Sequence, residues 1–559
     1  MKNIKYLIQF IFIILLIFIE TCTSIRTKIK QPIRVLILSG KNNHEWQKTT
    51  PVLERIIGDP ELFTTRVTEA PETLSFNTLK HFDVVVSNWN SWPDNDIRLD
   101  SQWEQDFLRF VKEGGGALFI HAGASSFYGW KEYHHMGIGR WGKETSHGAP
   151  TRARIFGFDQ DHPVTRGIQD FFITDEIWEK SDINPDAVAL ASVSATDETD
   201  GHPVAGPAVF VNQTGKGRSF YTILGHDERA MLNTGFGILL QRAVQWCAQR
   251  EVTINLPPEL TKAGNLQGTQ TWIETDTSVA LYRDGGVIWQ YNFRDRFGKP
   301  YFHPLCVNRA VLTCLSPPDH PWHLGLWFSW KYINGINYWE YLEDFRSPET
   351  GYRSEGITEV RNIRIVKNRD FSADINLGIW YYPVNGQEVM EEQRVIHVSP
   401  VFDDNSYYID EIYTFNARTD SVLLDRTPIP GEPGGQSWGG YAGLSLRFSQ
   451  DLVLSEIISP ADTGICQKCD WMYMGYQTLT DQRAGVVIMQ NQGYIPGSFA
   501  WYVIRDENTP FWYYSPAALY NHNMTLRMGQ PLKLSYRTWL LPGAASRADL
   551  QRRFDQYAR

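Results

Sequence analysis

The sequence has no excess of basic residues. Its 559 residues include 53 Lys and Arg against 63 Asp and Glu, so the formal net charge is −10. Proteins that bind nucleic acids do so through basic surfaces that contact the phosphate backbone. We therefore expect no nucleic-acid partner.

Cysteine is also scarce. Six cysteines in a chain of this length do not make a disulfide scaffold. Cys466 and Cys469 form a lone C-x-x-C motif. A zinc site would need a second pair of ligands at matching spacing, and a redox motif would need a surrounding βαβ pattern; neither is evident. We expect a short-loop disulfide here.

Long hydrophobic runs are limited to one near the N-terminus. Lys2 and Lys5 precede the apolar run Tyr6–Ile19, which has the length of a signal-peptide core and is short for a membrane-spanning helix. We expect residues 1–22 to be an export signal and residues 23–31 a polar tether. Cys22 is a candidate lipidation site, with plain secretion as the alternative. Both routes lead to the periplasm or cell surface, and only a lipid anchor would contact the membrane.

Aromatic residues, in contrast, are abundant. The chain has 20 Trp and 26 Tyr. Aromatic side chains cover the flat C–H faces of sugar rings, and their polar edges form hydrogen bonds. This composition favours an oligosaccharide ligand, although a large β-rich core would also use many aromatic residues.

Residues 32–250 show the alternation of an α/β domain. Apolar strand-like segments alternate with amphipathic helix-like segments, which predicts a parallel sheet with helices on both faces. Gly114 follows one of the helices and suits its C-terminal cap. The predicted strands are Ile33–Leu38, Phe82–Ser87, Ala117–Ile120 and Phe220–Leu224, and the predicted helices are Thr49–Ile57, Asp100–Lys112 and Gly235–Ala248.

Several histidines and acids follow these strands. Ligands of parallel α/β sheets bind at the carboxyl ends of the strands, so these side chains could converge in one crevice. Imidazole suits general acid/base catalysis or metal ligation near neutral pH, and a satisfied structural role is the alternative for any single histidine. The predicted catalytic residues are His121, His147, His226 and Asp227, the predicted substrate-binding residues are His44 and Trp141, and Asp175-Glu176 is an acidic pair between elements.

The order of motifs in this region resembles the ThuA (trehalose utilisation) family. The motifs are GGG at 114–116, FIHAGASS at 119–126, His147, HPV at 162–164, DE at 175–176, GKGRSFY at 215–221 and LGHD at 224–227. The resemblance implies the flavodoxin-like α/β fold of class I glutamine amidotransferases and a role in sugar metabolism, on keto sugars or otherwise modified glycosides.

The nucleophile of the amidotransferases is missing. Those enzymes place a cysteine in a strand-to-helix elbow, but this chain has His121-Ala122-Gly123 after the comparable strand and no cysteine nearby. Without a thiolate nucleophile, glutaminase chemistry is not expected.

Residues 252–559 lack helical periodicity almost completely. Short segments rich in β-branched and aromatic residues recur between turn signals, as in Gly285–Phe293, Ser372–Tyr382 and Pro531–Leu541. The Asn-Gly pairs at 334–335 and 385–386 suit type I′ hairpin turns. We predict an all-β sandwich domain.

The chemically richest part of this domain is residues 300–340. The segments Pro300–Leu305, Pro318–Phe328 and Trp339-Glu340, with the later Gly439–Leu444 and Arg447, resemble the PmoA-annotated family of sugar-degradation gene clusters. This chain has Trp322 and Leu324 where that family tends to carry His and Arg. A fusion of the two domains is similar to exported polysaccharide-utilisation proteins of the Bacteroidetes type.

Two chemical interpretations of this segment remain open. A turn at Pro321 could aim two imidazoles into one acid/base site with a carboxylate-binding arginine. A divalent metal is the competing interpretation, and a structural loop is the alternative to both. The candidate catalytic residues are His320, His323, Glu340 and Arg447, the candidate substrate-binding residues are Trp327 and Trp339, and the candidate metal ligands are His303, His320 and His323.

Taken together, these patterns predict an exported carbohydrate-active enzyme. Elimination (dehydration) or hydrolysis of a uronic or keto sugar fits, which makes it a lyase, a dehydratase or a glycoside hydrolase. No clean carboxylate pair, as glycoside hydrolysis normally requires, is evident in the second domain. A non-catalytic, glycan-binding lipoprotein at the cell surface is the alternative.

Overall fold

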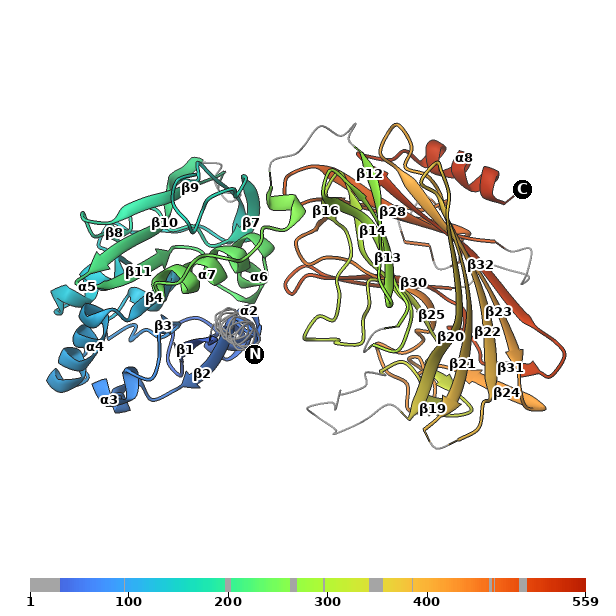
Figure 1. Cartoon of the computed structure of the whole chain (residues 1–559), viewed down its shortest axis with the longest axis horizontal. Coiled ribbons are helices and arrows are strands. Elements are labelled where there is room, and N and C mark those ends of the chain that lie inside the picture. Colours follow the sequence, from blue (N-terminus) through green and yellow to red (C-terminus); the bar gives the residue numbers. More distant parts are fainter. Residues whose placement is uncertain are drawn as a thin grey trace, which may run out of the picture.

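The computed structural model shows two domains joined near residue 260 (Figure 1). It describes residues 31–558 except 95, 197–202, 262–268, 295–296, 341–354, 385, 462–464, 467 and 492–499. The predicted export signal and Cys22 therefore lie outside the described residues. In the described part, no helix is both long and apolar enough to cross a membrane.

The first domain is built on one nine-stranded sheet, in the order β2-β1-β3-β4-β11-β10-β9-β6-β7. Strands β2, β1, β3, β4 and β11 are parallel. The strands are β1 (Ile33–Leu38), β2 (Phe63–Thr68), β3 (Val84–Ser87), β4 (Gly116–Ile120), β6 (Thr151–Phe156), β7 (Phe171–Asp175), β9 (Val188–Thr196), β10 (Pro203–Thr214) and β11 (Gly217–Thr222), and β5 (Gly139–Arg140) pairs separately with β8 (Asp182–Ile183).

Helices pack beside this sheet and close its hydrophobic core. Asp100 caps the helix that follows it, because its side chain accepts a hydrogen bond from the Gln102 N–H, and Gly114 ends the same helix with φ 123°. The helices are α2 (Trp46–Ile56), α3 (Phe76–Leu79), α4 (Ser101–Glu113), α5 (Lys131–Gly137), α6 (Glu228–Met231) and α7 (Thr234–Cys247), with the 3-10 turns η1 (Pro71–Thr73) and η2 (His121–Ala124).

The predicted α/β fold is confirmed, and its sheet is larger than the sequence pattern indicates. Strands β10, β9, β6 and β7 extend the parallel part with antiparallel pairing. The physical reason is the two-residue connection between β10 and β11, since so short a turn joins antiparallel neighbours only. Four reversals of direction bring β7 back parallel to β11, so both strands end at the same edge.

The second domain is mostly β-strands, as predicted. Its two large sheets run in the orders β12-β13-β14-β15-β17-β25-β30-β29 and β20-β21-β22-β23-β32-β28-β27-β26, with β16 paired to β15, and a small sheet runs β19-β18-β24-β31. Phe328 of one large sheet lies 4.4 Å, between ring centroids, from Tyr413 of the other. One hydrophobic core joins both sheets, which makes them a sandwich.

The strands of this domain are as follows. The first sheet contains β12 (Gln270–Glu274), β13 (Ser278–Arg283), β14 (Gly286–Asn292), β15 (Tyr301–Val307), β16 (Ala310–Val311), β17 (Leu326–Ser329), β25 (Gly443–Arg447), β29 (Ala500–Asp506) and β30 (Phe511–Ala517). The second contains β20 (Gly356–Lys367), β21 (Ala373–Pro383), β22 (Met390–Val398), β23 (Tyr407–Ala417), β26 (Val453–Ile458), β27 (Trp471–Gln477), β28 (Arg483–Gln490) and β32 (Leu532–Pro542). The small sheet contains β18 (Tyr332–Ile333), β19 (Ile336–Asn337), β24 (Ser421–Asp425) and β31 (Met524–Arg527); the 3-10 turn η3 (Pro258–Leu260) precedes the domain and helix α8 (Arg547–Tyr557) ends it.

Two local predictions can be compared with this structure. Asn334 and Gly335 have φ 52° and 79° between β18 and β19, which confirms the hairpin turn; Asn385 of the second Asn-Gly pair lies outside the described residues. The predicted disulfide is wrong, because Cys466 and Cys469 are both free thiols. The Cys469 thiol instead lies 3.4 Å from the Trp471 carbonyl oxygen.

The two domains meet through the edge of the first sheet and the start of α7. The Phe172 N–H donates to the Leu479 carbonyl at 2.9 Å, and Leu479 packs into the core of the first domain. The Asp451 carboxylate accepts hydrogen bonds from the Thr234 N–H at 2.8 Å and from its hydroxyl at 2.5 Å. These contacts couple the sandwich to the α/β domain.

Candidate functional site

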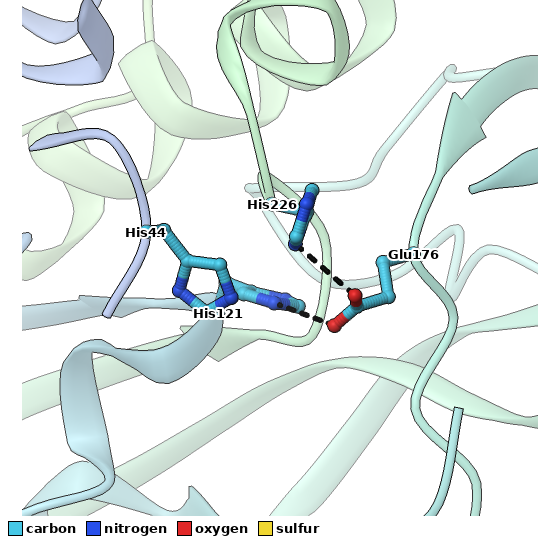
Figure 2. A group of neighbouring side chains, drawn as sticks. All are labelled: His44, His121, Glu176 and His226. Carbon is cyan, nitrogen blue, oxygen red and sulfur yellow. Dashed lines mark ion pairs between the residues drawn. The ribbon is translucent and has the colours of Figure 1, made fainter. Parts of the chain in front are cut away.

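Four side chains meet at the edge where β1, β4, β7 and β11 end. His44 lies in the loop after β1, and His121 and Glu176 directly follow β4 and β7. His226 lies four residues after β11. Because these four strands run in one direction, their carboxyl ends share an edge. Figure 2 shows the four side chains pointing toward one another.

The turn that carries His121 is tightly built. His121 has φ 47°, in the left-handed region that non-glycine residues rarely adopt. Gly123 passes so close to β3 that a Cβ would lie 2.2 Å from the Ser87 carbonyl oxygen. Only glycine fits there, so the chain fixes the direction in which His121 leaves β4.

The ligand atoms of this cluster are close enough to share one ion. One ligand atom from each of His44, His121, Glu176 and His226 lies within 4.8 Å of every other. His121 Nε2 is 3.4 Å from Glu176 Oε1, and His226 Nδ1 is 3.4 Å from Glu176 Oε2. Tetrahedral ligands at zinc–nitrogen bond lengths are separated by about 3.4 Å. The spacing therefore fits a small divalent metal.

The hydrogen bond of His121 directs a lone pair at the centre. Its Nδ1 lies 2.6 Å from the Ile223 carbonyl oxygen, which can only accept, so Nδ1 carries the proton. In the neutral ring Nε2 is then a lone pair, buried, without a hydrogen-bond partner and facing the Glu176 carboxylate. Two acceptors facing each other repel unless a cation lies between them. This is the arrangement of a metal ligand whose second nitrogen is held by a carbonyl.

His44 is oriented in the same way by asparagines. The Asn42 amide is fixed by two backbone groups, since its Nδ2 donates to the Asn88 carbonyl and its Oδ1 accepts from the His44 N–H. Asn42 Oδ1 also lies 3.1 Å from His44 Nδ1, which must therefore be the donor. This leaves a lone pair on His44 Nε2, which lies 3.4 Å from Asn43 Nδ2. Asn90 supports the arrangement by donating to both Asn42 and Asn43.

The electrostatics of the cluster keep the Glu176 carboxylate ionised beside the imidazoles. Burial, with the charges of His121 and His226 adding to it, lowers the pKa of His44 to about 3. Burial alone would raise the pKa of Glu176, but its contacts with His121 and His226 outweigh burial and hold that pKa well below its usual value. Burial lowers the pKa of His226, but its contacts with Glu176 outweigh burial, so the pKa is raised above its usual value. Glu176 is thus an anion that needs a positive partner.

Asp175 positions two of the four residues. Its carboxylate accepts hydrogen bonds from the backbone N–H groups of Glu176, Gly225 and His226, at 2.9, 2.7 and 3.1 Å. Burial raises the pKa of Asp175 to about 6. The side chain therefore ties the end of β7 to the loop after β11. Asp227 does something different: it caps α6 by accepting from the Ala230 N–H and does not line the pocket.

The cluster opens into a pocket of about 400 Å³. Trp178 donates to Glu176 Oε1 at 2.9 Å, and its ring lies 4.3 Å from that of His121. Half-exposed His147 lies 3.1 Å, through Nδ1, from Glu176 Oε2, and packs edge-on against Trp141. The described lining residues are Asn43, His44, Trp92, Ala122, Ser125, Trp141, His147, Glu176, Trp178 and His226.

The predicted site of the second domain divides into two groups. His320, His323, Trp339 and Glu340 line a second pocket. Arg447 is buried behind it, where Nη2 donates to Asp319 at 2.8 Å and the guanidinium lies 3.4 Å over the Phe511 ring. Trp327 is a buried core residue that does not line this pocket.

The predicted metal ligands of this domain do not converge. His320 and His323 are stacked with their ring centroids 4.6 Å apart. His303 instead contacts the Thr313 hydroxyl through Nδ1 at 2.9 Å, and burial lowers its pKa to about 4. In the described part of the chain, the ligand cluster that meets metal spacing is the one in the first domain. His303 lies on strand β15, and its ring is directed to Thr313, whereas the other two histidines lie in the loop before β17.

Some site residues were not apparent from the sequence. The order of motifs identifies Glu176 only as one member of an acidic pair. It does not indicate that Trp178 or Asn42 belongs to the site. The one available signal for Glu176 was its place directly after a strand, which matches the place of His121. Asn42 acts through His44, and such contacts between distant loops become visible only in the fold.

The first domain is an α/β domain that is similar to the ThuA family, and a mostly β domain follows it. Residues 34–247 match the ThuA family, described as trehalose utilisation. Residues 278–555 match a family of unknown function, DUF6807. No curated protein matches the chain.

Solved structures similar to the first domain include two ThuA-like proteins. The one from Parabacteroides merdae is 26% identical, with 41% of this chain and 95% of that chain covered and a TM-score of 0.36. The one from Bacteroides uniformis is 21% identical, with 38% and 92% covered and a TM-score of 0.31. A glutamine amidotransferase from Thermotoga maritima is 10% identical, with 39% and 98% covered and a TM-score of 0.25.

Proposed function

We propose that this protein is a metal-dependent, carbohydrate-active enzyme whose reaction takes place in the ThuA-like domain. The observation that carries the proposal is the convergence of one imidazole nitrogen from each of His44, His121 and His226 with the Glu176 carboxylate at metal-ligand spacing. A glycan-binding lipoprotein without activity has no need of such a cluster at the mouth of a pocket. The cluster therefore favours an enzyme over the binding alternative.

The donor set narrows the choice of metal. Three imidazoles with one carboxylate suit Zn²⁺, Mn²⁺, Fe²⁺ or Ni²⁺, whereas Ca²⁺ and Mg²⁺ prefer oxygen ligands. A bound ion of this kind polarises a carbonyl or hydroxyl oxygen of the substrate, or lowers the pKa of a bound water. The pocket on one side of the cluster leaves room for that oxygen.

His147 is the best-placed proton acceptor in the pocket. Its Nδ1 lies 2.8 Å from the Gly148 carbonyl and 3.1 Å from Glu176, both acceptors, so Nδ1 carries the proton. Nε2 is then free to take a proton from a substrate. With its side chain 40% exposed, the ring sits at the entrance, where a bound sugar passes.

The substrate class follows from this chemistry together with the ThuA resemblance. In a keto or uronic sugar, the C–H next to the carbonyl carbon is acidified. His147 takes that proton, the electron pair forms a C=C bond, and the C–O bond one carbon further breaks. The departing oxygen takes up a proton and leaves as an alcohol or as water. Glu176 is the one carboxylate among the described lining residues, so a two-carboxylate hydrolysis is less well supported.

The experiment is mass spectrometry of products from metal-loaded, full-length protein. The substrates are 3-keto glycosides, uronic-acid oligosaccharides and the matching unmodified sugars. We expect turnover of a keto or uronic sugar but not of the matching unmodified sugar, and loss of that turnover when a chelator is added. The product should be an unsaturated fragment one water lighter than the hydrolysis product. Fragments with the mass of the hydrolysis product would show that the reaction is hydrolysis and not elimination. Absence of turnover with all four metals would overturn the enzyme assignment.

Location and the role of the second domain are part of the proposal. We propose export to the periplasm or cell surface, with Cys22 as the lipidation site, from the N-terminal pattern alone. Labelling with a radioactive fatty acid in parent and Cys22→Ala protein tests this. The resemblance of the second domain to the PmoA-annotated family supports a role in the same carbohydrate metabolism.

A further inference from the structure

The second domain has a pocket of its own, of about 520 Å³. This lies within the range of about 300–1,000 Å³ that is usual for small-molecule sites. Seven of its twelve described lining residues are Trp, Tyr or Phe. We propose that this pocket, called the aromatic pocket below, binds a neutral pyranoside ring independently of the metal centre.

Aromatic faces make up its wall and rim. Trp339 is buried in the wall, and its ring centroid lies 4.8 Å from that of Tyr441. Trp438 stands at the rim with 51% of its surface exposed, and the Tyr502 hydroxyl donates to its carbonyl at 3.0 Å. The C–H face of a sugar ring is a fitting cover for such a platform.

A fixed carboxylate supplies a hydrogen-bond acceptor in the wall. Lys331 is buried and donates to Glu340 Oε1 at 2.5 Å. Lys299, also buried, donates to the Trp339 carbonyl. These two lysines hold Trp339-Glu340 in place. Glu340 Oε2 is buried and has no hydrogen-bond partner in the described structure, so it is left to accept from a ligand hydroxyl.

A histidine offers a second polar contact. His323 is 5% exposed, lines the pocket and is stacked between His320 and Tyr513, at 4.6 and 5.4 Å between centroids. Burial, with the charges of His320, Arg447 and Lys299, lowers its pKa well below the usual value, so the ring is neutral. Its Nδ1 is buried without a partner in the described residues. Burying such an atom costs free energy unless a ligand satisfies it.

These features select the class of ligand. Glu340 Oε2, a carboxylate oxygen without a donor, calls for a ligand hydroxyl and disfavours a second carboxylate beside it, and Asp319, which Arg447 pairs, adds a further acceptor to the lining. The aromatic faces call for an apolar face on the same molecule. A pyranose ring has both, because its hydroxyls project from the edge while its C–H bonds cover the faces.

The test measures sugar binding to full-length protein from which metal has been removed with a chelator, so that no turnover occurs. The probes are methyl pyranosides of glucose, galactose, mannose, xylose and rhamnose, the disaccharides of these sugars, and glucuronic acid as the anionic comparison. Saturation-transfer NMR detects binding and calorimetry measures Kd. We expect at least one neutral sugar to bind and glucuronic acid to bind more weakly than glucose.

Two matched tryptophans decide which pocket is responsible. Trp438, 51% exposed, lines the aromatic pocket, and Trp92, 43% exposed, lines the metal-site pocket. Trp438→Ala should weaken sugar binding at least tenfold, and Trp92→Ala should weaken it less than twofold. Glu340→Gln should also weaken sugar binding, while the protein keeps its thermal unfolding transition. The proposal is overturned if no probe binds, or if Trp92→Ala alone weakens binding. Metal content and turnover are measured separately, so the metal-centre proposal can fail or stand without affecting this result.

Discussion

His121 Nε2 and Glu176 Oε1 lie 3.4 Å apart, both side chains are buried, and His121 Nε2 has no hydrogen-bond partner among the described residues. The Ile223 carbonyl holds the proton of His121 on the opposite nitrogen. A lone pair and a carboxylate in such contact are stable only with a positive charge nearby. This pair is the basis for treating the end of β4 as a metal centre.

The contact between Asn42 and the His44 ring yields the first prediction. Asn42→Ala removes the acceptor that fixes the tautomer of His44. Loss of such a contact typically weakens metal binding by about 10–100-fold, and we expect that range for Zn²⁺ in a competition titration with a chelating dye. The exposed Asn77, whose side chain contacts Lys80, provides the control. Equal affinity in Asn42→Ala and Asn77→Ala would show that Asn42 does not orient a ligand.

Asp175 is predicted to act as a positioning residue. Asp175→Ala leaves three backbone N–H groups without their acceptor, at a cost of about 2–4 kcal/mol in the free energy of unfolding of the first domain. Because Glu176 and His226 lose their common anchor, metal affinity should fall as well. Urea unfolding and the dye titration measure the two effects. A variant that is destabilised but keeps full metal affinity would confine Asp175 to a structural role.

Stability is predicted to depend on pH through His303. Burial lowers the pKa of this imidazole to about 4, so the folded chain stays neutral there while the unfolded chain takes up a proton below pH 6.5. The unfolded state therefore binds more protons, and stability is lost as pH falls from 6.5 to 4, by at most about 3 kcal/mol. Scanning calorimetry of His303→Asn should show a smaller decrease in Tm over this range. His81→Asn, a change at an exposed site, is the control and should behave like the parent. If Tm of His303→Asn fell with pH as much as Tm of the parent and of His81→Asn, His303 would not be the source of the pH dependence.

The domain contact at Asp451 is predicted to be stabilising. Its carboxylate accepts two hydrogen bonds from Thr234 at the start of α7, and burial raises the pKa of Asp451 despite them. Asp451→Ala leaves the Thr234 N–H without its acceptor, which costs about 1–3 kcal/mol. We expect faster protease cleavage between residues 250 and 278 than in Asp555→Ala, a change on the exposed face of α8. Identical cleavage rates would mean that the two domains dock by other contacts.

The fold could be predicted from the sequence because its pattern is local. Ile33–Leu38 and the amphipathic helix that ends at Gly114 carry their own periodicity and caps, and both lie where predicted. The antiparallel extension β10-β9-β6-β7 could not be predicted, since its strands are partly exposed and their order depends on pairings between distant segments. The same holds for the two sheets of the sandwich.

The site could be predicted only in part, for a related reason. His121 follows β4 directly and His226 lies four residues after β11, so a strand-end argument finds them. Glu176 joins the cluster only because β7 returns parallel to β11 after the antiparallel strands that the sequence pattern did not indicate. His303, His320 and His323 are close in sequence, and closeness in sequence favoured a metal site there. In the structure His320 stacks on His323, but His303 is directed to Thr313 instead.

The central claim is a divalent metal at His44, His121, Glu176 and His226. The most direct test is elemental analysis of full-length protein loaded with Zn²⁺, Mn²⁺, Fe²⁺ or Ni²⁺ and dialysed, in the parent, in His226→Ala and in the control His320→Ala. The account predicts one bound ion per chain in the parent and in His320→Ala, and its loss in His226→Ala. A parent that retains none of the four metals, or a His226→Ala variant that retains as much as the parent, would contradict it.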